Sequence, residues 1–195
     1  MPDDGFRIGV AARLVRNDAR HHLQEWFMTP DGLIIRDAQT ADLLAVRALL
    51  VETWHATYDG LYGWQRVAEI TNAWHSLENL TAQLGRDGGT FLVALVEDEI
   101  IATASARVEP DGAALVTRLY VLPPWQGVGI GRTLLQVTLA CFPQAPVARL
   151  EVESQNEPAI AFYERMGFFL QRQARFDGRD DTPNTLLMAK RLFAA

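Results

Sequence analysis

The stretch Gln126-Gly127-Val128-Gly129-Ile130-Gly131-Arg132 decides the fold of this chain. The apolar run Leu115–Val121 precedes it and predicts a strand, and a helical pattern follows over Arg132–Phe142. Glycine allows a tight turn and the close approach of a ligand, where a Cβ would clash. A helix that begins at such a loop points free N–H groups and the positive end of its dipole at an anion. The stretch therefore predicts a phosphate-binding loop for a nucleotide-like cofactor.

The spacing of the glycines separates three kinds of phosphate-binding loop. A P-loop ends in a lysine, and no lysine follows the glycines here. A dinucleotide-binding loop reads G-x-G-x-x-G directly after its strand. Here the spacing is G-x-G-x-G, and Pro123-Pro124-Trp125 separates the strand from the glycines, which excludes that loop. The third kind is the acetyl-coenzyme A (acetyl-CoA) loop, [RQ]-x-x-G-x-[GA], which Gln126, Gly129 and Gly131 fill.

With these residues the chain resembles the GNAT superfamily of N-acetyltransferases. Arg118-Leu119-Tyr120-Val121 is similar to the family's fourth strand, and Leu150-Glu151-Val152 with the later Asn156 is similar to its fifth strand and the start of the next helix. Residues 159–168, AIAFYERMGF, are similar to that helix and its Gly-Phe exit. The resemblance implies an α/β (α+β) fold with a central, mostly antiparallel mixed sheet. Helices should flank this sheet, and its strands should splay at the cofactor site.

The resemblance divides the chain into an N-terminal extension, residues 1–30, and a GNAT domain, residues 31–195. Within the extension we expect a helix inside Phe6–Phe27. In the domain, Thr40 predicts the start of a helix that Tyr58-Asp59-Gly60 ends, and Trp64–Leu84 predicts a second helical region. Strands are expected over residues 33–35, 90–96, 99–108, 113–121 and 147–153, a helix over 157–166, and a closing hairpin over 168–176 and 185–190.

Composition and charge exclude several functional classes. The 195 residues are 49% hydrophobic and 22% charged, which is typical of one globular domain. A net charge of −6 argues against non-specific nucleic-acid binding. The sequence contains no run of roughly 18 apolar residues and no signal-peptide core, so we expect no membrane partner and a cytoplasmic location.

Cysteine and histidine usage predicts neither a metal site nor a covalent nucleophile. Cys141 is the single cysteine, which excludes a disulfide within the chain. Its position on an apolar helix face predicts an inert core thiol. The four histidines show no metal-ligand spacing, so we expect no metal.

The resemblance assigns acetyl-CoA to the glycine loop and to the strand before it. Backbone N–H groups of residues 128–132 are expected to bind its pyrophosphate, as the physics of a helix start also predicts. Backbone groups of the strand should pair with the pantetheine arm, and the Val121 N–H should polarise the thioester carbonyl. Two roles are open for Asn156, a contact to the cofactor arm and the N-cap of the helix that contains Pro158. The implied cofactor-binding residues are Leu119, Tyr120, Val121, Gln126, Gly127, Val128, Gly129, Ile130, Gly131, Arg132 and Asn156.

The resemblance also implies that Tyr163 and Glu151 are catalytic. The leaving group is a thiolate whose thiol has a pKa of about 8.5, and a phenol with a pKa of about 10 can return a proton to it. Tyr163 is therefore the expected general acid, and the alternative is a core aromatic beside Phe162 and Phe168. Glu151 matches the glutamate base of the ribosomal-protein alanine acetyltransferases, a GNAT branch. Its alternatives are a solvated acidic strand end and a base role filled by ordered water.

Substrate selection is expected near the junction of the first two helices. Aromatic side chains gather there and can form a pocket, although a core or a dimer contact would use the same residues. Two roles are open for Arg118 as well, recognition of a substrate carboxylate and a place at the sheet surface. The candidate substrate residues are Trp54, His55, Tyr58 and Arg118, with Tyr62 and Trp64 beside them.

The predicted activity is the transfer of an acetyl group from acetyl-CoA to the primary amine of a small molecule. The amine should attack directly through a tetrahedral intermediate, without a metal or a covalent enzyme intermediate. One alternative is a protein N-terminal acetyltransferase of the ribosomal-protein alanine type, which acts on a peptide N-terminus. Another is a non-catalytic acyl-CoA-binding module, which would dispense with Tyr163. A homodimer is compatible with the aromatic cluster.

Overall fold

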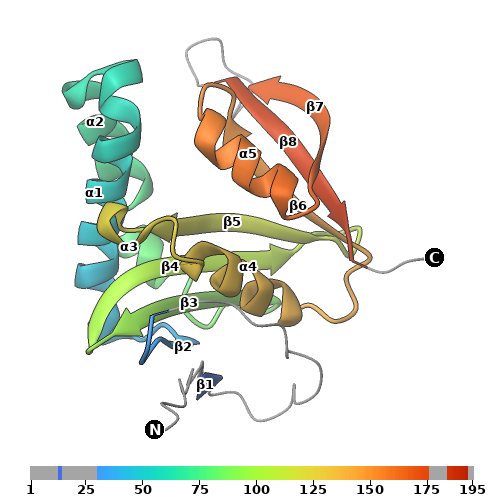
Figure 1. Cartoon of the computed structure of the whole chain (residues 1–195), viewed down its shortest axis with the longest axis horizontal. Coiled ribbons are helices and arrows are strands. Elements are labelled where there is room, and N and C mark those ends of the chain that lie inside the picture. The colour runs from blue at the N-terminus through green and yellow to red at the C-terminus, as the bar shows by residue number, and fades with distance from the viewer. Residues whose placement is uncertain (1–12, 15–29, 176–183, 193–195) are drawn as a thin grey trace, which may run out of the picture.

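A computed structural model describes residues 13–14, 30–175 and 184–192 of the chain. An eight-stranded sheet with the strand order β1-β2-β3-β4-β5-β6-β8-β7 forms its centre (Figure 1). The strands are β1 Arg13–Leu14, β2 Ile34–Asp37, β3 Gly89–Val96, β4 Glu99–Val108, β5 Ala114–Val121, β6 Val147–Glu153, β7 Phe169–Arg175 and β8 Asn184–Arg191. The helices are η1 Thr40–Asp42, α1 Leu43–Tyr62, α2 Trp64–Trp74, α3 Leu77–Thr81, η2 Pro123–Trp125, α4 Ile130–Ala140 and α5 Glu157–Arg165.

Helices cover both faces of the central strands, so β3 is buried along nearly its whole length. Successive side chains of a strand point to opposite faces. On β3, Phe91, Val93 and Leu95 pack against α1. Leu92 and Ala94 pack on the other face, in the cluster that also contains Ile130 and Leu134 of α4. The helices α1 and α4 therefore lie on opposite sides of the sheet, as Figure 1 shows.

The sheet is mostly antiparallel, with parallel pairing only at β1–β2 and β5–β6 among the described strands. The β5–β6 pairing is short, because it joins only three residue pairs and ends at Val116 and Leu150. At this point β5 carries a bulge: Ser105 pairs with Arg118 and Ala106 with Val116, which leaves Thr117 as an extra residue. A bulge bends its strand and increases the local twist. β5 and β6 separate beyond the bulge, which confirms the predicted splayed sheet.

The first long helix extends further than its sequence predicts. α1 passes through Tyr58-Asp59-Gly60 without a break and ends at Tyr62, before Gly63 in a positive-φ conformation (φ 77°). A glycine inside a helix costs only about 1 kcal/mol relative to alanine, and the burial of Tyr58 opposes this cost. The predicted second helical region is divided into α2 and α3 at Ser76, whose hydroxyl accepts the Asn79 N–H at 3.2 Å.

The helix predicted inside Phe6–Phe27 is wrong at Arg13–Leu14, which form a strand parallel to β2. The other residues of that prediction lie outside the described ranges. The helix predicted to begin at Arg132 begins at Ile130. The closing hairpin is confirmed, with β8 between β6 and β7. In the ranges that the structure describes, none of the helices combines the length and apolarity that a membrane span requires.

Candidate active site

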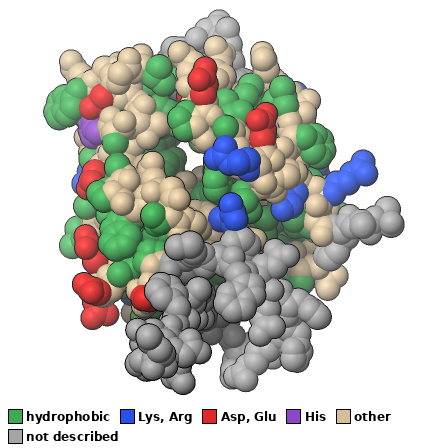
Figure 2. Space-filling view, in the orientation of Figure 1, with side chains coloured by type: hydrophobic (Ala, Val, Ile, Leu, Met, Phe, Trp, Pro, Cys, Tyr) green, Lys and Arg blue, Asp and Glu red, His purple; other side chains and the backbone are tan. Residues whose placement is uncertain are grey.

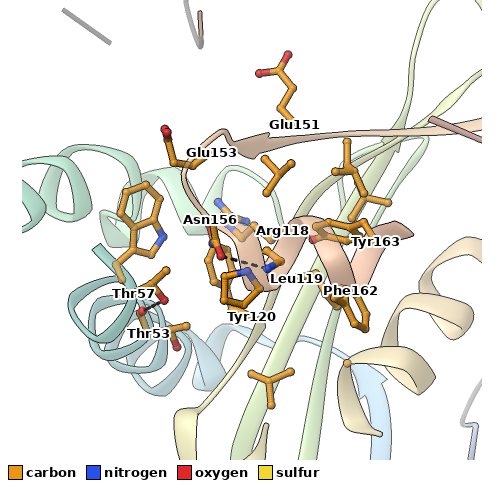
Figure 3. A pocket seen from close by; sticks show the side chains of 18 of the residues that line it. Thr53, Thr57, Arg118, Leu119, Tyr120, Glu151, Glu153, Asn156, Phe162 and Tyr163 are labelled. Carbon is orange, nitrogen blue, oxygen red and sulfur yellow. Dashed lines mark hydrogen bonds between the residues drawn. The ribbon is translucent and has the colours of Figure 1, made fainter. Parts of the chain in front are cut away.

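One cavity of about 1110 Å³ opens where β5 and β6 separate, and residues from both faces of the sheet line it (Figure 3). The start of α4, with Gly129 and Gly131, contributes to the wall on one face, and α1 contributes Thr53 and Trp54 on the other. Beyond Val116 and Leu150 the facing edges of the two strands are not paired with each other. The gap therefore exposes the facing backbone edges of β5 and β6 to a ligand, which can reach them from the α4 side or from the α1 side of the sheet.

The glycine loop has the geometry of an anion-binding helix start. Gly127 and Gly129 have positive φ angles of 79° and 92°, and Gly129 is the N-cap of α4. A positive φ strains residues other than glycine. The first intrahelical bond runs from the Thr133 N–H to the Gly129 carbonyl at 3.1 Å, so the preceding N–H groups point out of the helix end. These N–H groups are suited to phosphate oxygens.

Other predicted cofactor residues surround this helix start. The Gln126 side chain donates to the Val121 carbonyl at 2.9 Å and closes the loop onto the end of β5. Figure 2 shows basic side chains beside a hollow in this face, and Arg132 and Arg165 belong to the cavity wall. The Val128 side chain is exposed and that of Ile130 is buried in the core. Neither side chain lines the cavity, so only their backbone groups can contact a ligand there.

Tyr163 of α5 is buried and lines the same cavity. Its ring packs edge-on against Phe162 and Phe168, with centroids 5.2 and 5.8 Å away. Burial raises the pKa of the Tyr163 phenol above its ordinary value, so the phenol keeps its proton throughout the physiological range. The core packing and an acid role are therefore compatible in one side chain.

Asn156 connects two walls of the cavity. Its Oδ1 accepts the Ala159 N–H at 3.2 Å, so Asn156 is the N-cap of α5. Its Nδ2 donates to the Tyr58 hydroxyl of α1 at 3.1 Å. These bonds fix the start of α5 relative to α1, and Tyr163 lies two turns further along the same helix.

Two carboxylates of β6 face the α1 side of the sheet. Glu151 and Glu153 alternate with Leu150 and Val152, which pack with Tyr163 on the opposite face. Glu151 is largely exposed at the cavity wall, and partial burial raises the pKa of its carboxyl. Glu153 lies nearer to α1 (Figure 3) and is only 7% exposed. Its Oε1 accepts the Ser154 hydroxyl and the Gln155 N–H, at 3.1 and 3.3 Å.

The predicted substrate aromatics separate into two groups. Trp54 and Tyr58 are buried in a cluster with Val67 and Ile70, and both also line the cavity. His55 does not line it: its Nδ1 lies 2.7 Å from Asp59, and its ring stacks on Trp64 at 5.6 Å between centroids. His55 lies three residues before Tyr58 on α1, but its side chain contacts Asp59 and Trp64 instead of the cavity. The structure thus gives no support for a substrate contact by His55.

Arg118 is not at the sheet surface, because the residue is only 7% exposed. Its guanidinium donates to Gln83 Oε1 at 2.5 Å and to Ser105 Oγ at 3.4 Å. It also lies 5.5 Å from the centre of the Phe91 ring. Burial lowers the pKa of Arg118 from its ordinary value, although a guanidinium remains charged at any physiological pH.

His75 and Glu153 line the cavity but were not predicted as site residues. His75 is buried, and burial together with the nearby charge of Arg118 lowers the pKa of its imidazole to about 3, so it is neutral. Five buried side-chain polar atoms have no hydrogen-bond partner among the described residues, and each belongs to a residue of the cavity wall. These atoms are Trp54 Nε1, Tyr62 Oη, His75 Nδ1, His75 Nε2 and Glu153 Oε2. Buried polar groups are normally paired, so this cluster indicates a polar ligand or water in the α1 part of the cavity.

Two other predictions concern residues away from this cavity. Cys141, at the end of α4, is half-buried and directs its thiol to the Val137 carbonyl at 3.4 Å. It is not among the residues of the cavity wall, as expected for a packing residue. Within the described ranges, no three histidine, cysteine, aspartate or glutamate side chains cluster as metal ligands would.

Comparisons with known proteins agree with this geometry. The chain is 27% identical over 140 residues to the spermidine N(1)-acetyltransferase of Thermoplasma acidophilum. This match covers 69% of this chain and 86% of the relative. The fold of this chain resembles that of the PaiA N-acetyltransferase from Thermoplasma acidophilum, solved in complex with coenzyme A. The TM-score is 0.71 at 24% identity, and the match covers 82% of this chain and 98% of the PaiA chain. The ribosomal-protein-S18-alanine N-acetyltransferase of Escherichia coli gives a TM-score of 0.63 at 22% identity, with coverage of 84% and 96%.

The family itself follows from the sequence match. The sequence model of the acetyltransferase (GNAT) family matches residues 45–168, which extend from within α1 to just beyond α5. This span contains the splayed strands, the glycine loop and Tyr163. The chain therefore belongs to the GNAT family and is an acetyltransferase.

Proposed function

We propose that this chain transfers an acetyl group from acetyl-CoA to the primary amine of a small molecule. The observation that carries the proposal is one cavity that residues from both faces of the sheet line. Its α4 side contains a helix start suited to an anion, and its α1 side contains an aromatic pocket whose buried polar atoms include several without a hydrogen-bond partner among the described residues. Such an arrangement lets a phosphate-bearing acyl donor and an amine meet from opposite faces of the sheet.

The described residues fit acetyl-CoA. The N–H groups at the start of α4 would bind its pyrophosphate, with Arg132 and Arg165 in the adjacent wall. Leu119, Tyr120 and Val121 lie beyond the last β5–β6 pair, so their backbone would receive the pantetheine arm. When bound there, acetyl-CoA supplies a thioester that an amine can attack directly. The Val121 N–H would stabilise negative charge on the thioester oxygen.

Tyr163 is the proton donor of this proposal. It lines the cavity on the side of β6 that Leu150 and Val152 occupy, and its raised pKa keeps the phenol protonated. A protonated phenol can deliver its proton to the departing thiolate. A module that only bound acyl-CoA would not require this hydroxyl, so Tyr163 favours catalysis over simple binding.

Glu151 is our proposed proton acceptor, because a primary amine has a pKa of about 10 and reaches the site mostly protonated. The raised pKa of Glu151 brings the carboxylate closer to the proton affinity that a base needs. Glu153 is the competing carboxylate, since it is on the same strand face and its Oε2 has no partner among the described residues. Substitution of each carboxylate separately distinguishes the two.

The shape of the α1 side supports a small acceptor over a peptide N-terminus. Trp54, Tyr58, Tyr62 and Trp74 enclose that part of the cavity, and Trp54 is 4.8 Å from Tyr58 and 5.5 Å from Trp74 between ring centroids. A packed aromatic wall suits a compact ligand and leaves little room for a chain that continues beyond its first residues.

Release of free coenzyme A thiol from acetyl-CoA tests the proposed function, measured with a panel of small amines and with alanine-terminated peptides. We expect turnover with at least one small amine and a much lower kcat/KM for the peptides. Faster turnover with peptides would favour the N-terminal acetyltransferase. Tight binding of acetyl-CoA without turnover of any acceptor would support the binding module and refute the proposal.

A further inference from the structure

The α1 side of the cavity contains a buried positive charge, Arg118, that no carboxylate of the described residues neutralises. Arg118 is the only buried arginine or lysine among the described residues. Its polar partners are the neutral groups of Gln83 and Ser105, and no carboxylate in the described ranges forms an ion pair with it. By contrast, the more exposed Arg36 and Arg149 both pair with carboxylates.

An isolated buried charge is costly unless something pairs with it. The effective penalty for removing an ion from water is several kcal/mol even after the protein relaxes. Gln83 and Ser105 each supply an oxygen atom, but neither cancels a full charge. Because Arg118 lines the cavity, a ligand there can supply the missing negative charge.

The groups around Arg118 are also suited to an anion. His75 lies close enough for the arginine charge to lower the pKa of its imidazole, and both of its ring nitrogens lack a partner among the described residues. A neutral imidazole can donate one N–H without adding charge. Trp54 Nε1, which only donates, is unpartnered too and packs beside His75, with 5.6 Å between ring centroids.

The opposite charge occupies another part of the same wall. Glu153 faces Tyr62 near the end of α1, and burial, together with the interaction with the Glu153 side chain, raises the pKa of the Tyr62 phenol. Neither Glu153 Oε2 nor the Tyr62 hydroxyl has a hydrogen-bond partner among the described residues. Glu153 and Arg118 form no salt bridge, so two buried opposite charges line one cavity separately.

We propose that the acceptor amine also carries a carboxylate, which Arg118 binds, while its amino group lies toward the carboxylates of β6. A planar carboxylate can take two N–H groups of a guanidinium at once. The acceptor would thus be an amino acid or a close derivative. A polyamine such as spermidine carries only positive charges and would leave Arg118 unpaired. This inference rests on the proposed acetyl transfer and specifies its substrate class.

Matched amines test this inference, each amino acid being compared with its decarboxylated product. The pairs are phenylalanine and phenethylamine, leucine and isoamylamine, and lysine and cadaverine, with spermidine as a further acceptor. Thiol release should give a kcat/KM about 10- to 100-fold higher for the carboxylated member of at least one pair, the range expected for hydrogen bonds to a charged group. Equal rates within every pair, or a preference for spermidine, would overturn the inference and leave the acetyl transfer intact.

Variants of Arg118 show whether the arginine causes the preference. In Arg118→Met, the advantage of the carboxylated amine should disappear while kcat/KM for its decarboxylated partner stays within a few-fold. Arg118→Lys should retain part of the advantage, because it keeps the charge and loses the bidentate geometry. Arg107→Met, on the neighbouring strand β4 and outside the cavity wall, is the matched control. An equal loss for both amines of a pair would indicate a structural role for Arg118.

A binding measurement completes the test if the variants turn over slowly. Calorimetric titration of the wild-type complex with coenzyme A should show binding of the carboxylated amine, and that binding should be lost in Arg118→Met and retained in Arg107→Met. Binding that is unchanged in Arg118→Met would overturn the inference. Absence of turnover with every amine, by contrast, would refute the proposed function itself.

Discussion

The replacement Tyr163→Phe removes one hydroxyl group from the centre of the proposed reaction and leaves the packing almost unchanged. The ring would keep its edge contacts with Phe162 and Phe168, at 5.2 and 5.8 Å. No described residue forms a hydrogen bond with the Tyr163 hydroxyl, so its loss leaves no protein group unpaired. We therefore expect the free energy of unfolding to change by less than about 1 kcal/mol.

The expected effect is on kcat. General acid catalysis contributes about 10²- to 10⁴-fold, which corresponds to roughly 3–5 kcal/mol of activation free energy. Steady-state thiol release with a saturating amine should show this loss in Tyr163→Phe. The affinity for acetyl-CoA, measured by calorimetry, should change little, because the backbone of the glycine loop and of β5 provides most of the proposed contacts.

A change of leaving group distinguishes proton donation from a loss of packing. An aryl acetyl thioester releases a much more acidic thiol, which needs no proton from the enzyme. With this donor, Tyr163→Phe should approach the wild-type rate. An unchanged kcat with acetyl-CoA would refute the acid role, and an equal loss with both donors would show that the hydroxyl acts through structure.

Three further predictions concern the base, the loop and the fold. Glu151→Gln should lower kcat/KM about 10- to 100-fold near neutral pH and much less near pH 10, where much of the amine is already deprotonated. A larger loss in Glu153→Gln would assign the base role to Glu153. Gly129→Ala should weaken acetyl-CoA binding and destabilise the fold by about 1–2 kcal/mol, because Gly129 has a φ of 92°, which alanine adopts only with strain. Calorimetry measures the loss of binding, and thermal unfolding measures the loss of stability. The pKa of Asp42 is lowered mainly by its hydrogen bonds from Arg36, at 2.6 and 2.9 Å. The stability that this pair contributes is present above the ordinary aspartate pKa of about 4 and is lost as pH falls through the lower folded value. Wild type should therefore exceed Asp42→Asn by about 1 kcal/mol at pH 7 and converge with it in acid, as urea unfolding at several pH values would show.

The glycine loop before α4 could be predicted from the sequence because it depends on local backbone geometry, although the helix was predicted to begin two residues late, at Arg132. A positive φ at Gly129 and a helix start at Ile130 require only a short stretch of chain. Asn156 is likewise a local N-cap, and the helix that it begins places Tyr163 seven residues later. The position of Tyr163 in the cavity wall then follows from the packing of α5 against β6.

On the α1 side of the cavity, Trp54, Tyr58 and Arg118 were candidate site residues, but the sequence could not show how distant segments bring them together with His75 and Glu153. Arg118 is buried because a bulge in β5 and the side chain of Gln83 determine its surroundings, and no local pattern reveals either. His75 and Glu153 come from different elements and meet only at the cavity. The end of α1 was misplaced for the same reason, since the tertiary packing of Tyr58 outweighs the helix-breaking tendency of Gly60.

A crystal structure of the protein with acetyl-CoA tests the central claim most directly. We expect the pyrophosphate at the N–H groups that begin α4, the pantetheine arm between β5 and β6, and the thioester sulfur within hydrogen-bonding reach of the Tyr163 hydroxyl. Binding of acetyl-CoA outside the gap between the two strands, or a thioester sulfur beyond the reach of Tyr163, would contradict the claim.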